Sequence, residues 1–510
     1  MGENFVRAQP ETLALPQLVL LRLSGDIGTK SRPTQARFVQ RLVRNAKDAL
    51  RAEHIAARVV RTHNRIFVEA ERASAIDALS RVFGLSSLSL CLRRPAETLD
   101  DVVAAGVEIF AERVRGRRFA VRARRVGDRG PTAFGSRDVE LALGTALLPG
   151  AARVDLSNPE VTAFVELYEG QAYYFPDRVL APGGLPLGVE GRAVALVSGG
   201  FDSAVAAWLL QKRGVALDHV LCNLGGAVQE AGVVRVMKTL ADRWSYGTTP
   251  RLHVVDFAGV TQALRERTRP RYWQVVLKRL MLRAAEAVAR ERRALALVTG
   301  DALGQVSSQT LANLSVISQA TTLPILRPVI GLNKEEILTL ARQIGTYELS
   351  SVVGEYCALV PSHPATEASL VAVLAEEAKL EPGWIDAAVA TRKVIDLRSV
   401  DPDAVAVGLE DLEIDVVPDG ATVIDVRSRP AYTGWHWPDA LFLEFGHALA
   451  AYPKFDPGRT YVLYCEFGLK SAHLAERMRK AGFRAHNFRG GLRRLVSHAR
   501  ERGIAGPEFV

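Results

Sequence analysis

Four short apolar runs alternate with helix-like segments between residues 192 and 347, and this alternation constrains the fold more than any other feature of the chain. The runs read AVALV, HVLCNL, RLHVVDF and ALALVTG. Strands of a parallel sheet carry nearly continuous apolar sequence, because helices cover both faces of the sheet. The sequence therefore predicts a doubly wound parallel α/β domain, in which ligands bind at the carboxyl ends of the strands.

The first apolar run leads into a glycine loop, SGGFDS, at residues 198–203. Glycines let successive backbone N–H groups converge at the N-terminus of the following helix, and this makes an anion site. The commonest nucleotide loops add a lysine for the β- and γ-phosphates, but here Asp202 and hydroxyl groups stand in that place. A plain glycine turn is the alternative. A second segment, TGDALGQVSSQTL at residues 299–311, follows the last run, and we expect it at the same edge of the sheet.

Further units flank this domain, since 510 residues are too many for one hydrophobic core. Residues 17–85 alternate strand-like and helix-like segments in the order βαβα, which is typical of a small ferredoxin-like unit, and a second α+β unit follows. The Pro- and Gly-rich residues 176–188 predict a linker. A helical connector at residues 367–394 leads to a smaller α/β unit that begins near residue 421.

The composition argues against a membrane protein. Hydrophobic residues make up 48% of the chain and charged residues 24%. No uninterrupted apolar run reaches the roughly 18 residues that a membrane-spanning helix needs. The first residues also lack the basic region and long apolar core of a secretion signal. We therefore expect a cytoplasmic protein.

A basic strand lies within residues 113–125, which contain seven arginines and no acidic residue. Strand alternation would place Phe119 and Val121 on one face and Arg122 and Arg124 on the other. Such a cationic ridge suits the phosphates of RNA or DNA. Residues 1–150 contain 25 Lys and Arg against 16 Asp and Glu, an excess of +9 that equals the net charge of the whole chain. A solvated edge strand is the alternative. The predicted RNA-binding residues are Arg115, Arg117, Arg118, Arg122, Arg124 and Arg125.

The four cysteines are too few and too scattered for a disulfide scaffold, and no pair has zinc-site spacing. Cys465 ends the strand-like TYVLYC and opens the loop CEFGLKS, where a helix N-terminus and Lys470 favour the thiolate. Cys357 lies in a loop rich in Gly, Pro and Ser. It would be incidental alone, but together with Cys465 it makes a thiol–disulfide step natural. Cys91 and Cys222 are expected in the core.

Five motifs occur in this order along the chain: SGGFDS, TGDALGQVSSQTL, LRPVIGLNKEEI, EYC and CEFGLKS. On these motifs, the chain resembles the tRNA 4-thiouridine synthetase (tRNA sulfurtransferase) family. SGGFDS is similar to the PP-loop of ATP pyrophosphatases, and CEFGLKS is similar to the loop of rhodanese domains. The resemblance covers essentially the whole chain and implies a multidomain α/β protein. Its expected parts are an α+β ferredoxin-like domain (1–74), an α+β RNA-binding THUMP domain (75–178), a doubly wound PP-loop domain (189–395) and a small α/β rhodanese-like domain (418–510).

The resemblance also implies the residues of the reaction. Asp202 matches the PP-loop aspartate, and Lys334 matches a lysine implicated in activity. Cys465 matches the persulfide carrier, and Cys357 matches the cysteine that pairs with it. Magnesium is expected with ATP and would act through Asp202, although no metal-ligand set is assigned. The residues expected to bind ATP are Ala195, Leu196, Ser198, Gly199, Gly200, Asp202, Ser203, Lys278, Gly300 and Gln309.

The implied activity is the ATP-dependent formation of 4-thiouridine at position 8 of tRNA, by adenylation of the uridine and transfer of persulfide sulfur from Cys465. The implied partners are tRNA, a cysteine desulfurase as persulfide donor and a small sulfur-carrier protein of thiamine synthesis. The sequence leaves the oligomeric state open, with a homodimer as one option. Two alternatives stay open for the function: another PP-loop tRNA thiolase, or a non-catalytic RNA-binding protein that relays sulfur.

Overall fold

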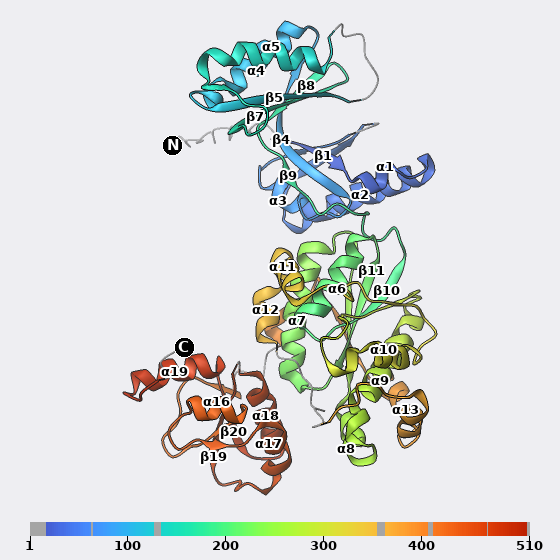
Figure 1. Ribbon diagram of the computed structural model, residues 1–510, viewed down its shortest axis with the longest axis vertical. Coiled ribbons are helices and arrows are strands. Elements are labelled where there is room, and N and C mark those ends of the chain that lie inside the picture. The colour runs from blue at the N-terminus through green and yellow to red at the C-terminus, as the bar shows by residue number, and fades with distance from the viewer. Residues whose placement is uncertain are drawn as a thin grey trace, which may run out of the picture. The chain divides into compact units, whose positions relative to one another are not determined.

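The computed structural model describes residues 17–62, 65–126, 134–353, 363–405, 412–466 and 468–506. The chain divides into two compact units, and Figure 1 labels many of their elements. Unit 1 holds residues 1–189 and 212–214, and unit 2 holds residues 190–211 and 215–510. Among the described residues, one large sheet forms unit 1, and two further sheets form unit 2.

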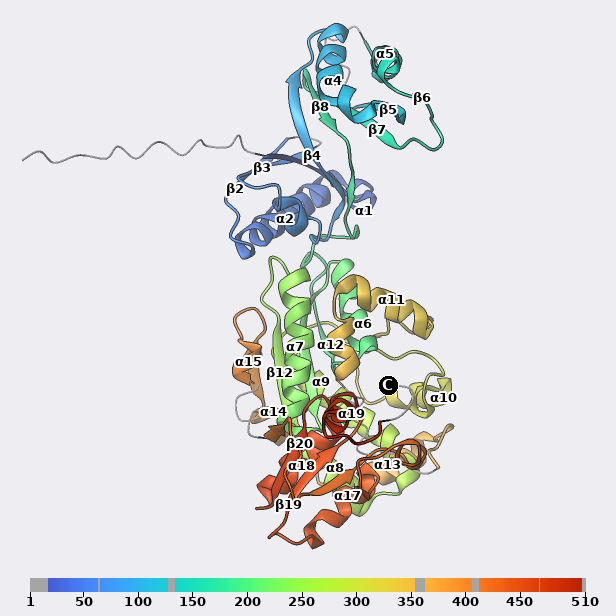
Figure 2. The same cartoon turned by 90° about the vertical axis from the view of Figure 1, so that its left-hand side faces the viewer.

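The ferredoxin-like half of unit 1 is an antiparallel sheet with strand order β2-β3-β1-β4. Helix α2 packs against it (Figure 2) through the apolar side chains Phe38, Leu42 and Leu50. The elements are β1 (Gln17–Leu23), α1 (Gly25–Gly28), α2 (Arg32–Ala52), β2 (Ala57–Arg61), β3 (Ile66–Ala70), α3 (Ala75–Leu79) and β4 (Leu85–Pro95).

The predicted βαβα order was incomplete, because it lacked β2 and β4. Strand β2 (ARVVR) is exposed or half-buried along its length, so it carries little apolar signal. Strand β4 (LSSLSLCLRRP) alternates leucine with serine and has none of the β-branched or aromatic residues that mark most strands. The predicted linker is also partly a strand, because β9 (Val179–Leu180) pairs with β4.

The second half of unit 1, which the resemblance predicts to be a THUMP domain, continues the same sheet through β8-β7-β5-β6. Strands β7 and β8 form a hairpin, whose turn residues Glu169 and Gly170 both have positive φ. Two helices pack closely, since a Cβ on Gly106 would lie 2.7 Å from Leu143 Cδ1. The elements are α4 (Leu99–Val114), β5 (Arg118–Arg125), α5 (Ser136–Leu147), β6 (Arg153–Val154), β7 (Val161–Tyr168) and β8 (Gln171–Phe175).

A buried ion cluster joins the two halves of unit 1. Glu166 on β7 accepts hydrogen bonds from Arg22 Nε at 2.6 Å and Arg65 Nη2 at 3.0 Å. Arg22 also donates to Ser89 Oγ at 3.0 Å and lies over the ring of Phe175. Since β4 runs through both halves as well, they form one body with a continuous sheet.

The first sheet of unit 2 has the order β14-β13-β10-β11-β12-β15. All strands are parallel except β15, which begins at the end of the predicted helical connector and pairs antiparallel with β12. This confirms the predicted doubly wound α/β domain. The strand order reverses between β10 and β13, and such a reversal opens a crevice at the carboxyl ends of the strands. The strands are β10 (Arg192–Leu196), β11 (Ala216–Asn223), β12 (Arg251–Asp256), β13 (Leu297–Val298), β14 (Ile325–Leu326) and β15 (Lys393–Asp396).

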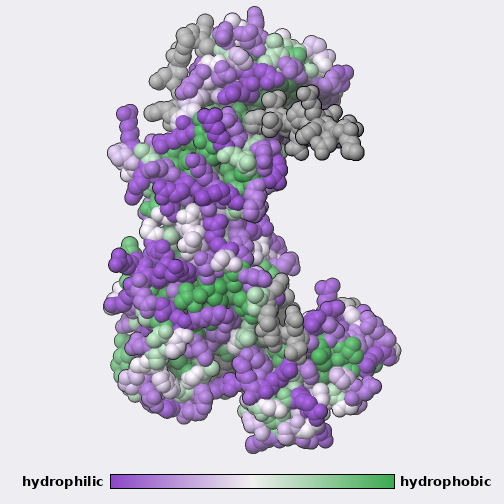
Figure 3. Space-filling model, turned by 180° about the vertical axis from the view of Figure 1, so that it is seen from behind, coloured by the Kyte–Doolittle hydropathy of each residue, from purple (hydrophilic) through white to green (hydrophobic). Residues whose placement is uncertain are grey.

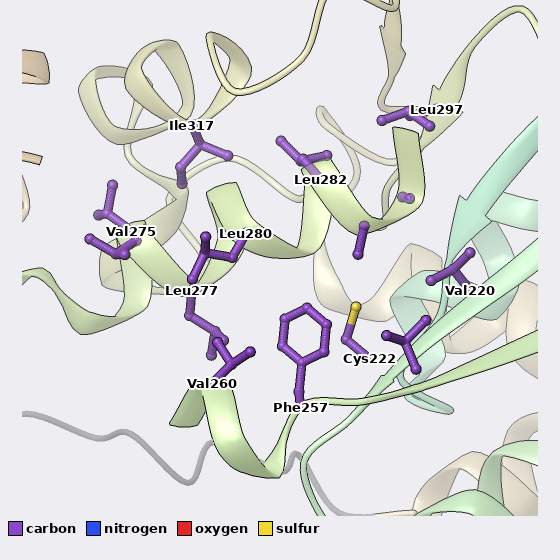
Figure 4. Close-up of a cluster of buried hydrophobic side chains, with 14 of the residues drawn as sticks. Val220, Cys222, Phe257, Val260, Val275, Leu277, Leu280, Leu282, Leu297 and Ile317 are labelled. Carbon is purple, nitrogen blue, oxygen red and sulfur yellow. The ribbon is translucent and has the colours of Figure 1, made fainter. Parts of the chain in front are cut away.

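Helices cover this sheet and form its core. In Figure 4, Leu280 and Leu282 of one long helix lie on the same side of the sheet as Phe257 and Cys222. Cys222 is buried, as expected, and so is Cys91 in unit 1. The helices are α6 (Phe201–Lys212), α7 (Gly226–Trp244), α8 (Ala258–Arg267), α9 (Trp273–Glu291), α10 (Leu311–Ser318), α11 (Lys334–Ile344), α12 (Tyr347–Val352), α13 (Leu370–Glu377) and α14 (Trp384–Ala390).

The second sheet of unit 2 is fully parallel, with the order β16-β20-β19-β17-β18. Strand β16 begins before residue 418, where the rhodanese-like domain was predicted to start. Apolar clusters lie on both faces of the central strand β19. The elements are α15 (Pro402–Val405), β16 (Glu413–Ile414), β17 (Thr422–Asp425), α16 (Arg429–Gly434), β18 (Leu441–Phe442), α17 (Phe445–Ala451), β19 (Thr460–Tyr464), α18 (Leu469–Lys480), β20 (Arg484–Phe488) and α19 (Gly491–Glu501).

Among the described residues, no helix combines the length and the apolar character that crossing a membrane requires. The face of the molecule in Figure 3 is mainly hydrophilic, with smaller hydrophobic areas between the hydrophilic ones.

Candidate functional site

The glycine loop follows β10, at the point where the strand order reverses. Gly199 has a φ of +82°, which favours glycine. A Cβ at this position would also lie only 2.7 Å from Val353 Cγ1. Helix α6 begins at Phe201, directly after the loop. The N–H groups of its first turn have no partner within the helix, so the loop and the helix together present donors to an anion.

Asp202 and Lys334, two of the residues predicted for catalysis in this domain, contact each other. Lys334 Nζ donates to Asp202 Oδ1 at 3.3 Å, and Gln305 Nε2 donates to Asp202 Oδ2 at 3.2 Å. Lys334 also lies over the ring of Phe201. It is the first residue of α11, whose N-terminus is fixed by a capping box between Asn333 and Glu336. The fold thus brings together two side chains that are 132 residues apart in the chain.

The TGD segment after β13 lies against the glycine loop, as the sequence predicted. A Cβ on Gly300 would lie 2.7 Å from both Asp202 C and Ser203 N, so the two backbones touch. Ala195 and Leu196 form the end of β10 beside them. Lys278 reaches the same place from α9, and Gln309 from the turn before α10, because both donate to Asp301. The residues expected to bind ATP therefore gather at one edge of the sheet.

Asp301 is a member of this cluster that the sequence analysis did not single out. It accepts hydrogen bonds from Lys278 Nζ at 2.9 Å, Thr299 Oγ1 at 2.7 Å, Arg327 Nε at 3.2 Å and Gln309 Nε2 at 3.5 Å. Burial alone would raise the pKa of its carboxyl, but the charge of Lys278 and the other donors outweigh burial and lower the pKa to about 2. The sequence signal that could have indicated Asp301 is its position just after the end of a predicted strand.

Cys465 lies in the second sheet, directly after β19, in a loop that leads to the N-terminus of α18. Its thiol is buried, and Ser471 Oγ donates to Sγ at 3.3 Å. The start of α19 also contacts this loop, since Leu492 N donates to Cys465 O at 2.9 Å. Lys470 is exposed. Cys357 lies outside the described residues, so its pairing with Cys465 stays a prediction.

Arg427 and Asp425 form a buried pair at the entrance of the Cys465 loop. Arg427 Nη2 and Nε donate to the Asp425 carboxylate at 2.7 and 3.0 Å, and Tyr464 Oη donates to the same group at 2.7 Å. Arg427 Nη1 also lies 3.6 Å from Glu466 Oε2. The residues just before and after Cys465 are therefore tied to the end of β17.

The basic strand β5 has the predicted apolar face, because Phe119 and Val121 are buried. Ala120 is also buried, so the first half of the strand is covered on both faces. Several of the predicted RNA-binding arginines are held by neighbours: Arg115 pairs with Glu112, Arg118 with Glu160 and Asp155, Arg122 donates to Leu156 O, and Arg125 donates to Phe134 O. Arg117 and Arg124 are exposed.

Comparison with known proteins identifies the family. Family models match residues 18–89 (ThiI ferredoxin-like domain), 96–175 (THUMP domain), 188–381 (Thiamine biosynthesis protein, ThiI) and 402–498 (Rhodanese-like domain). The chain is 37% identical to the tRNA sulfurtransferase of Pyrobaculum aerophilum over 474 residues, which cover 93% of this chain and 96% of that protein. The chain belongs to the tRNA sulfurtransferase family.

Other members of the tRNA sulfurtransferase family are similarly related. The protein of Thermoplasma acidophilum is 35% identical over 500 residues, or 96% of this chain and 98% of that one. Among solved structures, the crystal structure of a 4-thiouridine synthetase–RNA complex with bound ATP matches with a TM-score of 0.64 and 30% identity. It covers 74% of this chain and 99% of that chain. The predicted multidomain α/β fold, with ferredoxin-like, THUMP, PP-loop and rhodanese-like parts, is confirmed.

Proposed function

We propose that this chain is an ATP-dependent tRNA sulfurtransferase that makes 4-thiouridine at position 8 of tRNA. One observation carries the proposal: the glycine loop, Asp202, Lys334 and Gly300 meet at the switch point of a parallel sheet. The same chain also carries Cys465 at a helix N-terminus. The family membership and the related 4-thiouridine synthetase with bound RNA and ATP support the assignment.

The first step activates the uridine. O4 of the uracil attacks the α-phosphate of ATP, the bond from that phosphorus to the bridging oxygen breaks, and pyrophosphate leaves with the electron pair. The N–H groups of the loop and of the first turn of α6 would hold the departing pyrophosphate. Lys334 and Lys278 would neutralise its charge. O4 thereby becomes part of AMP, which is a much better leaving group than an oxygen bonded only to carbon.

The second step delivers sulfur. The terminal sulfur of a persulfide on Cys465 attacks C4 of the adenylated uridine, and AMP leaves. The thiolate of Cys357 then attacks Cys465 Sγ, so that the sulfur stays on the base and a Cys357–Cys465 disulfide forms. A dithiol reductant opens this disulfide for the next turnover. The hydrogen bond from Ser471 would hold Cys465 Sγ in place while it accepts the persulfide sulfur.

Magnesium fits the site, because this ion is usually bound through one or two carboxylates together with substrate phosphates. Asp202 would supply the carboxylate. The bound ion would neutralise charge on the phosphates during the first step. A cysteine desulfurase as persulfide donor, a sulfur-carrier protein as a second acceptor and a cytoplasmic location complete the proposal, and tRNA would contact the arginines around β5.

A matched pair of variants tests whether Asp202 serves the ATP-dependent step and Cys465 the sulfur-transfer step. Asp202→Ala should abolish tRNA-dependent release of pyrophosphate from ATP but leave persulfide loading of Cys465 by a desulfurase intact. Cys465→Ser should abolish persulfide loading but leave tRNA-dependent release of pyrophosphate intact. Both half-reactions are measured on the full chain, by pyrophosphate assay and by mass spectrometry of the labelled protein. A non-catalytic sulfur-relay protein would release no pyrophosphate in any variant, and that result would contradict the proposal.

A further inference from the structure

Two cations converge on the buried carboxylate of Asp301. Lys278 Nζ lies 2.9 Å from Oδ1, and Arg327 Nε lies 3.2 Å from Oδ2. The two partners come from different elements, since Lys278 is on α9 and Arg327 follows β14. Arg327 is also held at its other end, because Nη2 donates to Ser318 Oγ at 2.8 Å. Nη1 of Arg327 has no hydrogen-bond partner in the part of the chain that the structure describes, so it is free to bind an anion.

The charge of this cluster does not balance. Asp202 faces one cation, Lys334, whereas Asp301 faces two. The five side chains together hold one more positive than negative charge, and Gly300 brings Asp301 next to the first turn of α6. An excess positive charge beside the donors of a helix N-terminus suits a polyphosphate.

Gln309 gives an independent sign of a ligand on the other side of Asp301. Its side chain is more than nine-tenths buried. A carboxylate only accepts hydrogen bonds, so the amide nitrogen faces Asp301 and the amide oxygen faces away. This oxygen, Oε1, is buried without a hydrogen-bond partner among the described residues. Phosphates cannot donate to it, but a ribose hydroxyl or a base amino group can.

We infer that Asp301 is a positioning residue of the nucleotide site, which holds Lys278 and Arg327 toward the phosphates and Gln309 toward the nucleoside. Arg327 is then a phosphate-binding residue beside Lys278. The inference rests on the proposed function, because it takes this edge of the sheet as the ATP site. Its physical basis is preorganisation: Lys278 and Arg327 are long side chains that would otherwise spread over many rotamers, and one buried carboxylate fixes both.

The test is the dissociation constant of ATP for the full chain without tRNA, measured by calorimetry. Asp301→Asn keeps the shape but removes the charge, and should weaken ATP binding at least tenfold. In a Lys278→Met background, the loss of ATP affinity caused by Asp301→Asn should be at least threefold smaller. The reason is that one of the side chains that Asp301 positions is already absent. Wild-type protein that fails to bind ATP would contradict both the proposed function and this inference.

A matched control separates positioning from simple stability. Asp218 is also buried between two arginines, Arg192 and Arg292, each at 2.8 Å, but it lies near the start of β11. Asp218→Asn should lower the melting temperature as Asp301→Asn does, yet change the ATP dissociation constant less than twofold. Equal ATP affinity in the wild type and Asp301→Asn would overturn the inference while the proposed function stands. Arg327→Gln, which leaves the buried carboxylate in place, should weaken ATP binding at least fivefold, and unchanged binding would also overturn it.

Discussion

At the scale of single residues, the nucleotide site depends on close backbone contact. Gly300 touches the backbone of Asp202 and Ser203, and neither of these can move without displacing the first turn of α6. The only space for a side chain at this position is already filled by main-chain atoms. Gly300 therefore sets how closely the end of β13 approaches the glycine loop.

Gly300→Ala should accordingly weaken ATP binding about tenfold, since forcing a methyl group against backbone atoms costs roughly 1–3 kcal/mol. Gly259→Ala is the control, because a Cβ there meets no atom within 4 Å and α8 tolerates alanine. Calorimetric titration of both variants with ATP checks the prediction. An unchanged dissociation constant for Gly300→Ala would show that the loop is not part of the ATP site.

At Cys465, the reactivity of the sulfur depends on a hydrogen bond from Ser471. Ser471→Ala removes the hydroxyl that donates to Sγ. Cys465 should then be alkylated about three- to tenfold more slowly, because a hydrogen bond that holds the sulfur in position contributes roughly 0.5–1.5 kcal/mol. The rate of iodoacetamide alkylation at Cys465, followed by peptide mass spectrometry, measures the effect. Ser497→Ala, in which an exposed serine of α19 is changed, should react at the wild-type rate.

At the scale of elements, strands β11 and β12 each carry one buried histidine. Burial lowers the pKa of both His219 and His253 to about 4. The side chains must stay neutral in the fold, whereas in the unfolded chain they take up protons at pH values near 6.5. The unfolded state therefore binds more protons between pH 6.5 and 4, and the free energy of unfolding falls as the pH falls through this window.

His219→Leu should reduce this loss of stability by roughly 3 kcal/mol, which is the linkage value of one such histidine. Denaturant unfolding of the wild type and the variant at several pH values between 7 and 4 measures it. His447→Gln, which changes an exposed histidine of α17, should leave the pH dependence as it is. A His219→Leu protein that loses stability as steeply as the wild type would contradict the assignment.

At the scale of the whole molecule, predictability follows from how local each signal is. Strands β10, β11, β12 and β13 were predictable because each lies in a run dominated by apolar residues, whereas the short β14 and the exposed β15 carry no such signal. Strand β4 was not, since its leucines alternate with serines and its pairing with three other strands is set far away in the chain. In the site, the glycine loop was predictable from the motif SGGFDS between a strand and a helix. The roles of Lys278 and Lys334 came from family resemblance. The role of Asp301 needed coordinates, because sequence does not say which carboxylate will meet Lys278 and Arg327 in space.

The central claim is that one chain activates a uridine in unit 2 and then supplies its sulfur from Cys465. Mass spectrometry of unmodified tRNA incubated with the full chain, ATP, magnesium, cysteine, a cysteine desulfurase and a reductant tests it most directly. The account predicts a single 4-thiouridine at position 8, formed by the wild type and absent with Asp202→Ala or Cys465→Ser. Unmodified tRNA from the wild type, or 4-thiouridine formed equally well by Asp202→Ala, would contradict it.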